Sequence, residues 1–358
     1  MKTLVVKIGT STLVRNGGID DAYIADVARQ IAELHSQKWR VVIVSSGAIR
    51  AGLDAIGRER ASRLPEKQAA AAIGQSLLMR AYRRAFNEQS TPVAQILLTR
   101  ADIADRGRFL NARQTFSQLF NWNVVPIVNE NDTVATEEIR FGDNDMLASL
   151  TALVSEAELV LLLSDVDGFY MPGEKMPVAR VEQITPEIEN AAGGAGSVGG
   201  TGGMRTKIEA AQVATQAGID LVIASGREKN VITRVANEEV LGTRFCAKAG
   251  LRGRKRWIAY GRHASGVLRL HDKARESLIG KNSSLLPIGI LQVEGHFEPG
   301  ALVVLRDSAG EFARGLTNFS DEDLRQIAGK HSFEISSILG RADFKEAIHR
   351  DNLILTHK

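Results

Sequence analysis

A glycine-rich segment that ends in a lysine and runs into a helix is the strongest chemical signal in the sequence. It covers Gly199 to Lys207 and reads Gly-Gly-Thr-Gly-Gly-Met-Arg-Thr-Lys. Glycines let backbone N–H groups turn toward one ligand, a helix N-terminus carries partial positive charge, and the lysine adds a full charge. The segment predicts a phosphate site, with a flexible linker as the alternative. It is not a P-loop, because Thr206 precedes Lys207 and no Ser or Thr follows it.

A second cation, Lys7, interrupts the apolar strand expected over Thr3 to Ile8. Burying a lysine there is costly unless an anion meets it, although a lysine at a strand end can also reach water. Polar turns follow this strand at Gly9 to Ser11 and follow the next strand, Val41 to Val44, at Ser45 to Ile49. Because ligands bind beyond the carboxyl ends of parallel strands, the two turns are expected to line one crevice.

Three further polar clusters adjoin expected strands or helices. Asn129 to Asp132 follows a strand over Val124 to Val128, and Ser164 to Gly168 follows the most apolar strand of the chain. A solvated loop is the alternative reading of the first cluster. Gly142 to Asp145 precedes a helix, where it is either an acidic N-cap or a set of partners for a substrate ammonium or amide.

The elements that position these clusters alternate between strands and helices. A long helical pattern over Lys67 to Glu88 is followed by a strand at Val93 to Leu98 and by another amphipathic helix that includes Phe109 and Phe120. This alternation predicts an α/β layered fold. After Gly261 the pattern changes to short strands such as Gly266 to Leu270, punctuated by glycine and proline, which predicts a separate β-rich domain.

Composition bounds the class of protein. The formal net charge of +3 on 358 residues is too small to argue for a nucleic-acid partner. The single cysteine, Cys246, excludes an internal disulfide, and no secretory signal or membrane-length apolar run is present. The histidines are too scattered to predict a metal site. A cytoplasmic protein without membrane association is therefore expected.

Together these clusters resemble the amino-acid kinase family, and within it the members that phosphorylate the side-chain carboxylate of L-glutamate. The resemblance covers nearly the whole chain and implies a mostly parallel central sheet with helices on both faces. The segments that carry it are Val6–Ser11, Ser45–Ile49, Leu97–Asp102, Asn129–Asp132, Gly142–Asp145, Ser164–Gly168 and Gly200–Lys207.

The resemblance also implies a domain organisation. Residues 1–255 are expected to form the catalytic domain, 256–265 a linker, and 266–358 a small β-rich PUA domain with a C-terminal tail. PUA domains bind RNA in other proteins, but a basic run at Arg252 to Arg256 is more typical of a solvated linker or an intersubunit contact. RNA binding is therefore possible without further support from the sequence.

For the site, the resemblance implies a direct transfer from ATP, carried with Mg²⁺, to an ionised carboxylate. Lys7 and Lys207 are expected to flank the transferring group, with Asp165 holding both lysines in place. Asp132 is the expected partner of the substrate α-ammonium. The full expected substrate set is Ser46, Gly47, Asp132, Asn144 and Asp145, and the expected nucleotide set is Lys7, Ser164, Asp165, Thr201, Gly202, Gly203, Met204, Arg205, Thr206 and Lys207.

The same resemblance implies a homo-oligomer, either a dimer or a tetramer, and feedback inhibition by proline. Two other functions stay open. One is a kinase of the same family that acts on acetylglutamate, aspartate or carbamate, which the Asn129 to Asp132 cluster and the C-terminal domain disfavour. The other is an RNA-binding protein with a degenerate kinase fold, which intact Lys7, Asp165 and Lys207 disfavour.

Overall fold

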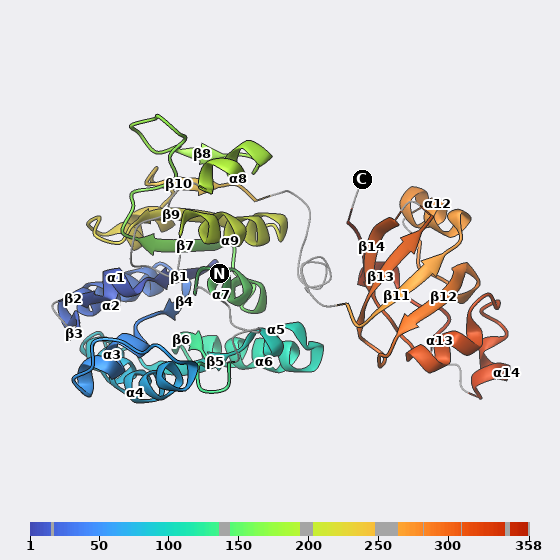
Figure 1. Cartoon of the computed structure of the whole chain (residues 1–358), viewed down its shortest axis with the longest axis horizontal. Helices are drawn as coiled ribbons and strands as arrows, with labels where there is room; N and C mark the ends of the chain where they lie inside the picture. Colours follow the sequence, from blue (N-terminus) through green and yellow to red (C-terminus); the bar gives the residue numbers. More distant parts are fainter. Residues whose placement is uncertain are drawn as a thin grey trace. The chain divides into compact units, whose positions relative to one another are not determined.

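A computed structural model of the 358-residue chain describes residues 1–15, 18–135, 144–193, 203–247, 264–281, 283–308, 310–340 and 344–356. The chain divides into two compact units, Met1–Gly250 and Leu251–Lys358. The division falls near the end of the expected catalytic domain at residue 255. Both units are shown in Figure 1.

The first unit is built on an eight-stranded sheet in the order β5-β6-β4-β1-β7-β9-β10-β8. The strands β5, β6, β4, β1, β7 and β9 run parallel to one another. Strands β10 and β8 run antiparallel to them. A parallel sheet places the carboxyl ends of its strands along one edge, where α/β folds bind ligands. The strands are β1 (Thr3–Ile8), β4 (Arg40–Ser45), β5 (Val93–Leu98), β6 (Val125–Glu130), β7 (Leu159–Ser164), β8 (Arg180–Val181), β9 (Asp220–Ser225) and β10 (Thr243–Phe245), with a separate short pair, β2 (Val14–Arg15) and β3 (Gly18–Ile19).

Helices cover both faces of this sheet. Helices α2, α4 and α10 contribute to the core on one face, whereas α7 packs on β1 and β7 and also contacts α6 and α9. The helices are α1 (Thr10–Leu13), α2 (Asp21–Ser36), α3 (Ala48–Ala55), α4 (Leu64–Glu88), α5 (Arg100–Ala104), α6 (Arg106–Asn121), α7 (Asn144–Val154), α8 (Pro186–Ala192), α9 (Met204–Gln216) and α10 (Val231–Ala236). The expected fold class is confirmed.

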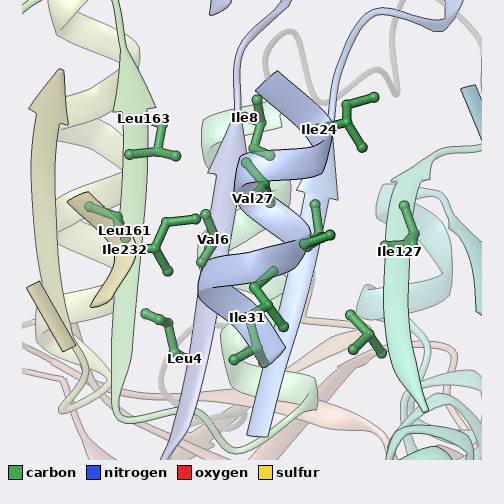
Figure 2. Close-up of a cluster of buried hydrophobic side chains, with 14 of the residues drawn as sticks. Leu4, Val6, Ile8, Ile24, Val27, Ile31, Ile127, Leu161, Leu163 and Ile232 are labelled. Atoms are coloured by element: carbon green, nitrogen blue, oxygen red, sulfur yellow. The ribbon is translucent and has the colours of Figure 1, made fainter. Parts of the chain in front are cut away.

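Side-chain alternation along β1 decides which face each residue serves. Leu4, Val6 and Ile8 point into the core beneath α2, where Ile24 and Val27 meet them (Figure 2). Lys7 lies between two of these positions and therefore points to the opposite face, toward α7. All six residues of β1 are buried, which is typical of a central parallel strand.

Helices α3 and α4 cross with their backbones in contact. A Cβ atom built on Gly52 would lie 1.8 Å from the Ala70 carbonyl oxygen, and one built on Gly74 would lie 1.8 Å from the Ala48 carbonyl oxygen. Only glycine fits such an approach, so the two helices form one rigid layer. Because α3 begins at Ala48, this crossing also fixes the turn that precedes it.

Substituting Gly74 with alanine is expected to destabilise the first unit by about 1–3 kcal/mol, because the helices must separate to admit the methyl group. Chemical denaturation monitored by circular dichroism measures the change. Gly107→Ala is the matched control: Gly107 is an exposed helical glycine in the same unit, and its new Cβ would meet only Asp105 at 3.4 Å. An equal loss in both variants would contradict the close crossing.

The second unit contains a five-stranded sheet in the order β12-β11-β13-β14-β15. Strands β11 and β13 run parallel, and the other neighbours are antiparallel. Its apolar core is separate from that of the first unit. The elements are β11 (Gly266–Leu270), α12 (Asp272–Lys281), the 3₁₀ turn η1 (Pro287–Gly289), β12 (Ile290–Gly295), β13 (Leu302–Asp307), β14 (Gly310–Leu316), α13 (Asp321–Ile327), α14 (Ile335–Leu339), the 3₁₀ turn η2 (Arg350–Asn352) and β15 (Leu353–Leu355).

Within the described ranges, no helix is both long enough and apolar enough to cross a membrane.

Candidate active site

Two buried lysines converge on one buried carboxylate. Lys7 Nζ lies 2.6 Å from Asp145 Oδ1, and Lys207 Nζ lies 2.9 Å from Asp145 Oδ2. Asp145 is fully buried, and each lysine is 5% exposed. Buried charges are tolerated when they are paired and hydrogen-bonded, so this triad holds both ammonium groups in place inside the unit.

Three separate elements bring these residues together. Lys7 points from β1 toward the face that α7 and α9 cover. Asp145 lies in the first turn of α7, where the helix dipole favours a negative charge, and Lys207 lies in the first turn of α9. Ser149 of α7 donates a hydrogen bond of 2.8 Å to the Ala210 carbonyl of α9, which fixes the two helices against each other.

The carboxylate that contacts both lysines corrects one expectation. We expected Asp165 to hold them, but Asp145 does so. Asp165 is exposed in the turn after β7, and its carboxylate accepts a hydrogen bond of 3.1 Å from the Ser164 hydroxyl. Sequence position could not separate the two aspartates, because each lies in a polar cluster, Gly142 to Asp145 or Ser164 to Gly168.

Gly9 and Gly203 lie next to the two lysine-bearing elements. A Cβ atom on Gly9 would lie 3.6 Å from Lys7 Nζ, and one on Gly203 would meet none of the described residues within 4 Å. Gly203 is the N-cap of α9, so the first N–H groups of that helix have no acceptor within it. Two ammonium groups, glycine turns and a helix N-terminus together suit the anionic phosphates of a nucleotide.

A second group of polar side chains adjoins the triad on the α3 side. Asn144, which precedes Asp145 in α7, donates 2.8 Å to Ser46 Oγ and 3.1 Å to the Ser45 carbonyl oxygen. Its amide also lies 3.2 Å from Asn129 Oδ1. The structure therefore brings together Ser46 and Asn144, two of the residues expected to bind an amino-acid substrate. They lie next to the triad of Lys7, Asp145 and Lys207.

The turn that carries Ser46 has a conformation that requires glycine. Gly47 has φ of +97°, and a Cβ there would lie 3.1 Å from Leu13 Cδ2. Beneath the turn, Ser45 Oγ and the Tyr82 hydroxyl share a buried hydrogen bond of 2.9 Å. Burial raises the pKa of the Tyr82 phenol, so this group stays neutral and keeps its proton for hydrogen bonding.

The other residues expected in the site differ in burial and in the groups that they contact. Asp132 lies half-buried in the turn after β6, and Ser164 is buried at the end of β7. Thr206 Oγ1 donates 2.9 Å to the Gly203 carbonyl oxygen. Arg205 is exposed and pairs with Glu209 at 3.3 Å along α9, so its side chain contacts solvent and its own helix. Met204 opens α9 and is half-buried, whereas Thr201 and Gly202 lie outside the described residues.

Asn129 and Gln75 were not among the expected site residues. Asn129 is 3% exposed, and its Nδ2 donates 2.9 Å to Gln75 Oε1 of α4. The polar run at the end of β6 could have indicated Asn129. Nothing in the sequence around Gln75 distinguishes it from other polar residues of a long helix.

Across the part of the chain that the structure describes, no group of three or more His, Cys, Asp or Glu side chains is arranged to hold a metal ion.

Comparison with known proteins matches this geometry to a family. The sequence profile of the amino acid kinase family matches residues 2–225, and that of the PUA domain matches residues 266–339. The chain belongs to the amino acid kinase family, and the expected resemblance to this family is confirmed. A solved structure of Giardia carbamate kinase has the same fold, with a TM-score of 0.50 and 17% identity over 69% of this chain and 99% of that one.

Curated relatives are similar over almost their full length. A protein named glutamate 5-kinase from Carboxydothermus hydrogenoformans is 46% identical over 99% of this chain and 98% of its own. A glutamate 5-kinase from Citrifermentans bemidjiense has the same identity and coverage. These names and the family confirm that the chain is an enzyme of the kinase class.

Proposed function

We propose that this chain transfers the γ-phosphoryl group of ATP to the side-chain carboxylate of L-glutamate, which gives ADP and L-glutamyl 5-phosphate for proline biosynthesis. The observation that carries the proposal is the adjacency of two sites. The buried lysine pair on Asp145 suits a phosphoryl group, and Ser46 with Asn144 beside it suits an amino acid. The relatives named glutamate 5-kinase support the choice of acid.

The proposed reaction needs no general base. A side-chain carboxylate has an ordinary pKa near about 4.3, so it is already an anionic nucleophile at neutral pH. The obstacle is its repulsion by the anionic phosphate, which makes catalysis a matter of positioning and charge neutralisation. Lys7 of β1 and Lys207 of α9 supply the positive charge for that neutralisation, and Asp145 fixes the position of both ammonium groups.

On the acid side, Ser46 and Asn144 offer a hydroxyl and an amide to the substrate, and Gly47 lets the turn approach it closely. Asp132 is the proposed partner of the α-ammonium group. A hydroxyl, an amide and a carboxylate together favour free glutamate over N-acetylglutamate, because acetylation removes the positive charge that Asp132 would meet.

On the nucleotide side, Ser164, Asp165 and the segment from Thr201 to Lys207 are proposed to bind ATP. Bound Mg²⁺ would neutralise charge on the nucleotide phosphates. Asp165 would face the hydration shell of that ion, because it is an exposed carboxylate directly after β7. Among the described residues, nothing lies within 4 Å of a Cβ atom built on Gly203, which supports placing the phosphates beside the N-terminus of α9.

The proposal extends to the biology of the enzyme. We propose a cytoplasmic homo-oligomer, a dimer or a tetramer, that proline inhibits as the end product of its pathway. These features follow from the family resemblance.

ATP-dependent trapping with hydroxylamine tests the substrate assignment. An acyl phosphate reacts with hydroxylamine to give a hydroxamate, which is detected as its coloured ferric complex, so product is expected with L-glutamate and not with N-acetylglutamate or L-aspartate. Product from one of the other acids would keep the phosphoryl-transfer site but refute the choice of substrate. Absence of product from all three would refute the proposed reaction.

A further inference from the structure

We propose that Gln75, on α4, is a positioning residue of the acid-binding site and acts through Asn129 on Asn144. This inference rests on the proposed function, because it assumes that Asn144 and Ser46 bind the acid substrate. Gln75 itself need not touch the substrate. Its part is to hold the amide of Asn129 in the one orientation that supports Asn144.

A continuous chain of hydrogen bonds links α4 to the site. Gln75 Oε1 accepts a hydrogen bond of 2.9 Å from Asn129 Nδ2. Asn129 Oδ1 then accepts from Asn144 Nδ2 at 3.2 Å, and Asn144 Nδ2 also donates 2.8 Å to Ser46 Oγ. Three amide side chains from three elements are therefore hydrogen-bonded in series behind the turn of Ser46 and Gly47, which we call the substrate turn.

Backbone groups at Asn129 and Asn144 fix the orientation of those two amides, and Asn129 in turn fixes that of Gln75. The Glu130 N–H donates 2.9 Å to Asn129 Oδ1, and a peptide N–H cannot accept. The Ser45 carbonyl accepts 3.1 Å from Asn144 Nδ2, and a carbonyl cannot donate. Asn129 must therefore direct its NH₂ group at Gln75, and Gln75 must accept this hydrogen bond with its side-chain oxygen. Inverting any one amide would set donor against donor or acceptor against acceptor.

Helix α4 is a rigid support for this bond. Gly74, next to Gln75, lies against the backbone of α3, as the 1.8 Å distance between its hypothetical Cβ and the Ala48 carbonyl oxygen indicates. Tyr82, about two helical turns further along the same helix, shares a hydrogen bond with Ser45 beneath the substrate turn. Helix α4 thus supports both the substrate turn after β4 and the end of β6. Side chains of a site are held more precisely when helices and strands position them.

Loss of the Gln75 oxygen should weaken acid binding selectively. Asn129 is 3% exposed, so its NH₂ group would be left buried without its acceptor unless the amide rotates. Rotation would turn that NH₂ group toward the NH₂ group of Asn144 and disturb the contact with Ser46. We expect the KM for glutamate to rise about tenfold, the scale of one lost buried hydrogen bond, with the KM for ATP unchanged.

Steady-state kinetics of Gln75→Met measures this split, because methionine keeps the length of the side chain and removes its acceptor oxygen. Gln75→Ala is measured beside it in case methionine is not tolerated. Ser76→Ala is the matched control, since Ser76 is the next residue of α4, is exposed, and donates a hydrogen bond to the Ile73 carbonyl oxygen of its own helix. Equal rises in both KM values, or loss of folding in both Gln75 variants, would make the role of Gln75 merely structural and overturn the proposal.

A double-mutant cycle with Asn129→Ala tests the route of the effect. If Gln75 acts through Asn129, adding Gln75→Met to Asn129→Ala should change kcat/KM for glutamate by less than about twofold. Multiplication of the two single effects would refute action through Asn129. The wild-type acid preference is determined first. If wild-type enzyme prefers another acid, the proposed substrate fails, but the cycle is run with that acid and still decides the role of Gln75.

Discussion

Replacing Lys207 with alanine is expected to lower turnover by about 100-fold or more, the scale of a lost electrostatic stabiliser of a transition state. The ammonium group of Lys207 is buried and held 2.9 Å from Asp145, so no water-exposed lysine can take its place without rearrangement. Because the acid-binding residues lie on other elements, the KM for glutamate should change much less than kcat. Initial rates of ADP release at saturating substrates measure the loss.

Lys38→Ala is the matched control for this experiment. Lys38 is exposed and lies just before β4 begins, at the amino ends of the parallel strands and away from the site. Its removal should leave turnover unchanged. A folded Lys207→Ala protein that keeps wild-type turnover would contradict the proposed role of the lysine pair.

Replacing Asp145 with asparagine is expected to have the largest effect on stability of any substitution in the site. Two buried lysines lose the carboxylate that both contact, and removing one member of a buried ion pair typically costs about 3–5 kcal/mol. Turnover should fall as well, because the ammonium groups are no longer fixed. Urea unfolding of the first unit, together with turnover of the folded fraction, measures both effects.

Asp165→Asn separates this account from the one that the sequence suggested. Asp165 is exposed and bonds to Ser164, so its substitution should change the free energy of unfolding by less than about 0.5 kcal/mol. The large effect of this substitution should instead be on kcat/KM for ATP. If Asp165→Asn destabilised the protein as strongly as Asp145→Asn, the assignment of the lysine-holding role to Asp145 would be wrong.

Much of the fold could be predicted from the sequence because its strands are nearly continuous apolar runs. The strand expected over Thr3 to Ile8 is β1 to the residue, and the one over Gly266 to Leu270 is β11. Polar clusters at strand ends were also informative, because a parallel sheet brings these ends to one edge. Ser46, which directly follows β4, lies beside Asn144 in the first turn of α7, although 98 positions separate them.

The sequence could not show which aspartate contacts the lysines or that Gln75 of α4 accepts a hydrogen bond from Asn129. The first depends on the direction in which Lys7 leaves β1, on α7 packing against that strand, and on α9 packing against α7. The second depends on the crossing of α3 and α4, in which Gly74 and Gly52 set the distance between helices. Neither contact is local in the chain, so periodicity and spacing carry no signal for it.

The most direct test of the central claim follows the oxygen atoms of the acceptor. L-Glutamate labelled with ¹⁸O in its side-chain carboxylate is incubated with ATP and enzyme, and the product is trapped with hydroxylamine. Hydroxylamine attacks the carbonyl carbon, so the bridging oxygen leaves with the phosphate. If the carboxylate is the nucleophile, mass spectrometry will find one ¹⁸O atom in the phosphate released for each hydroxamate formed. Phosphate that contains no ¹⁸O would contradict direct transfer from ATP to the glutamate carboxylate.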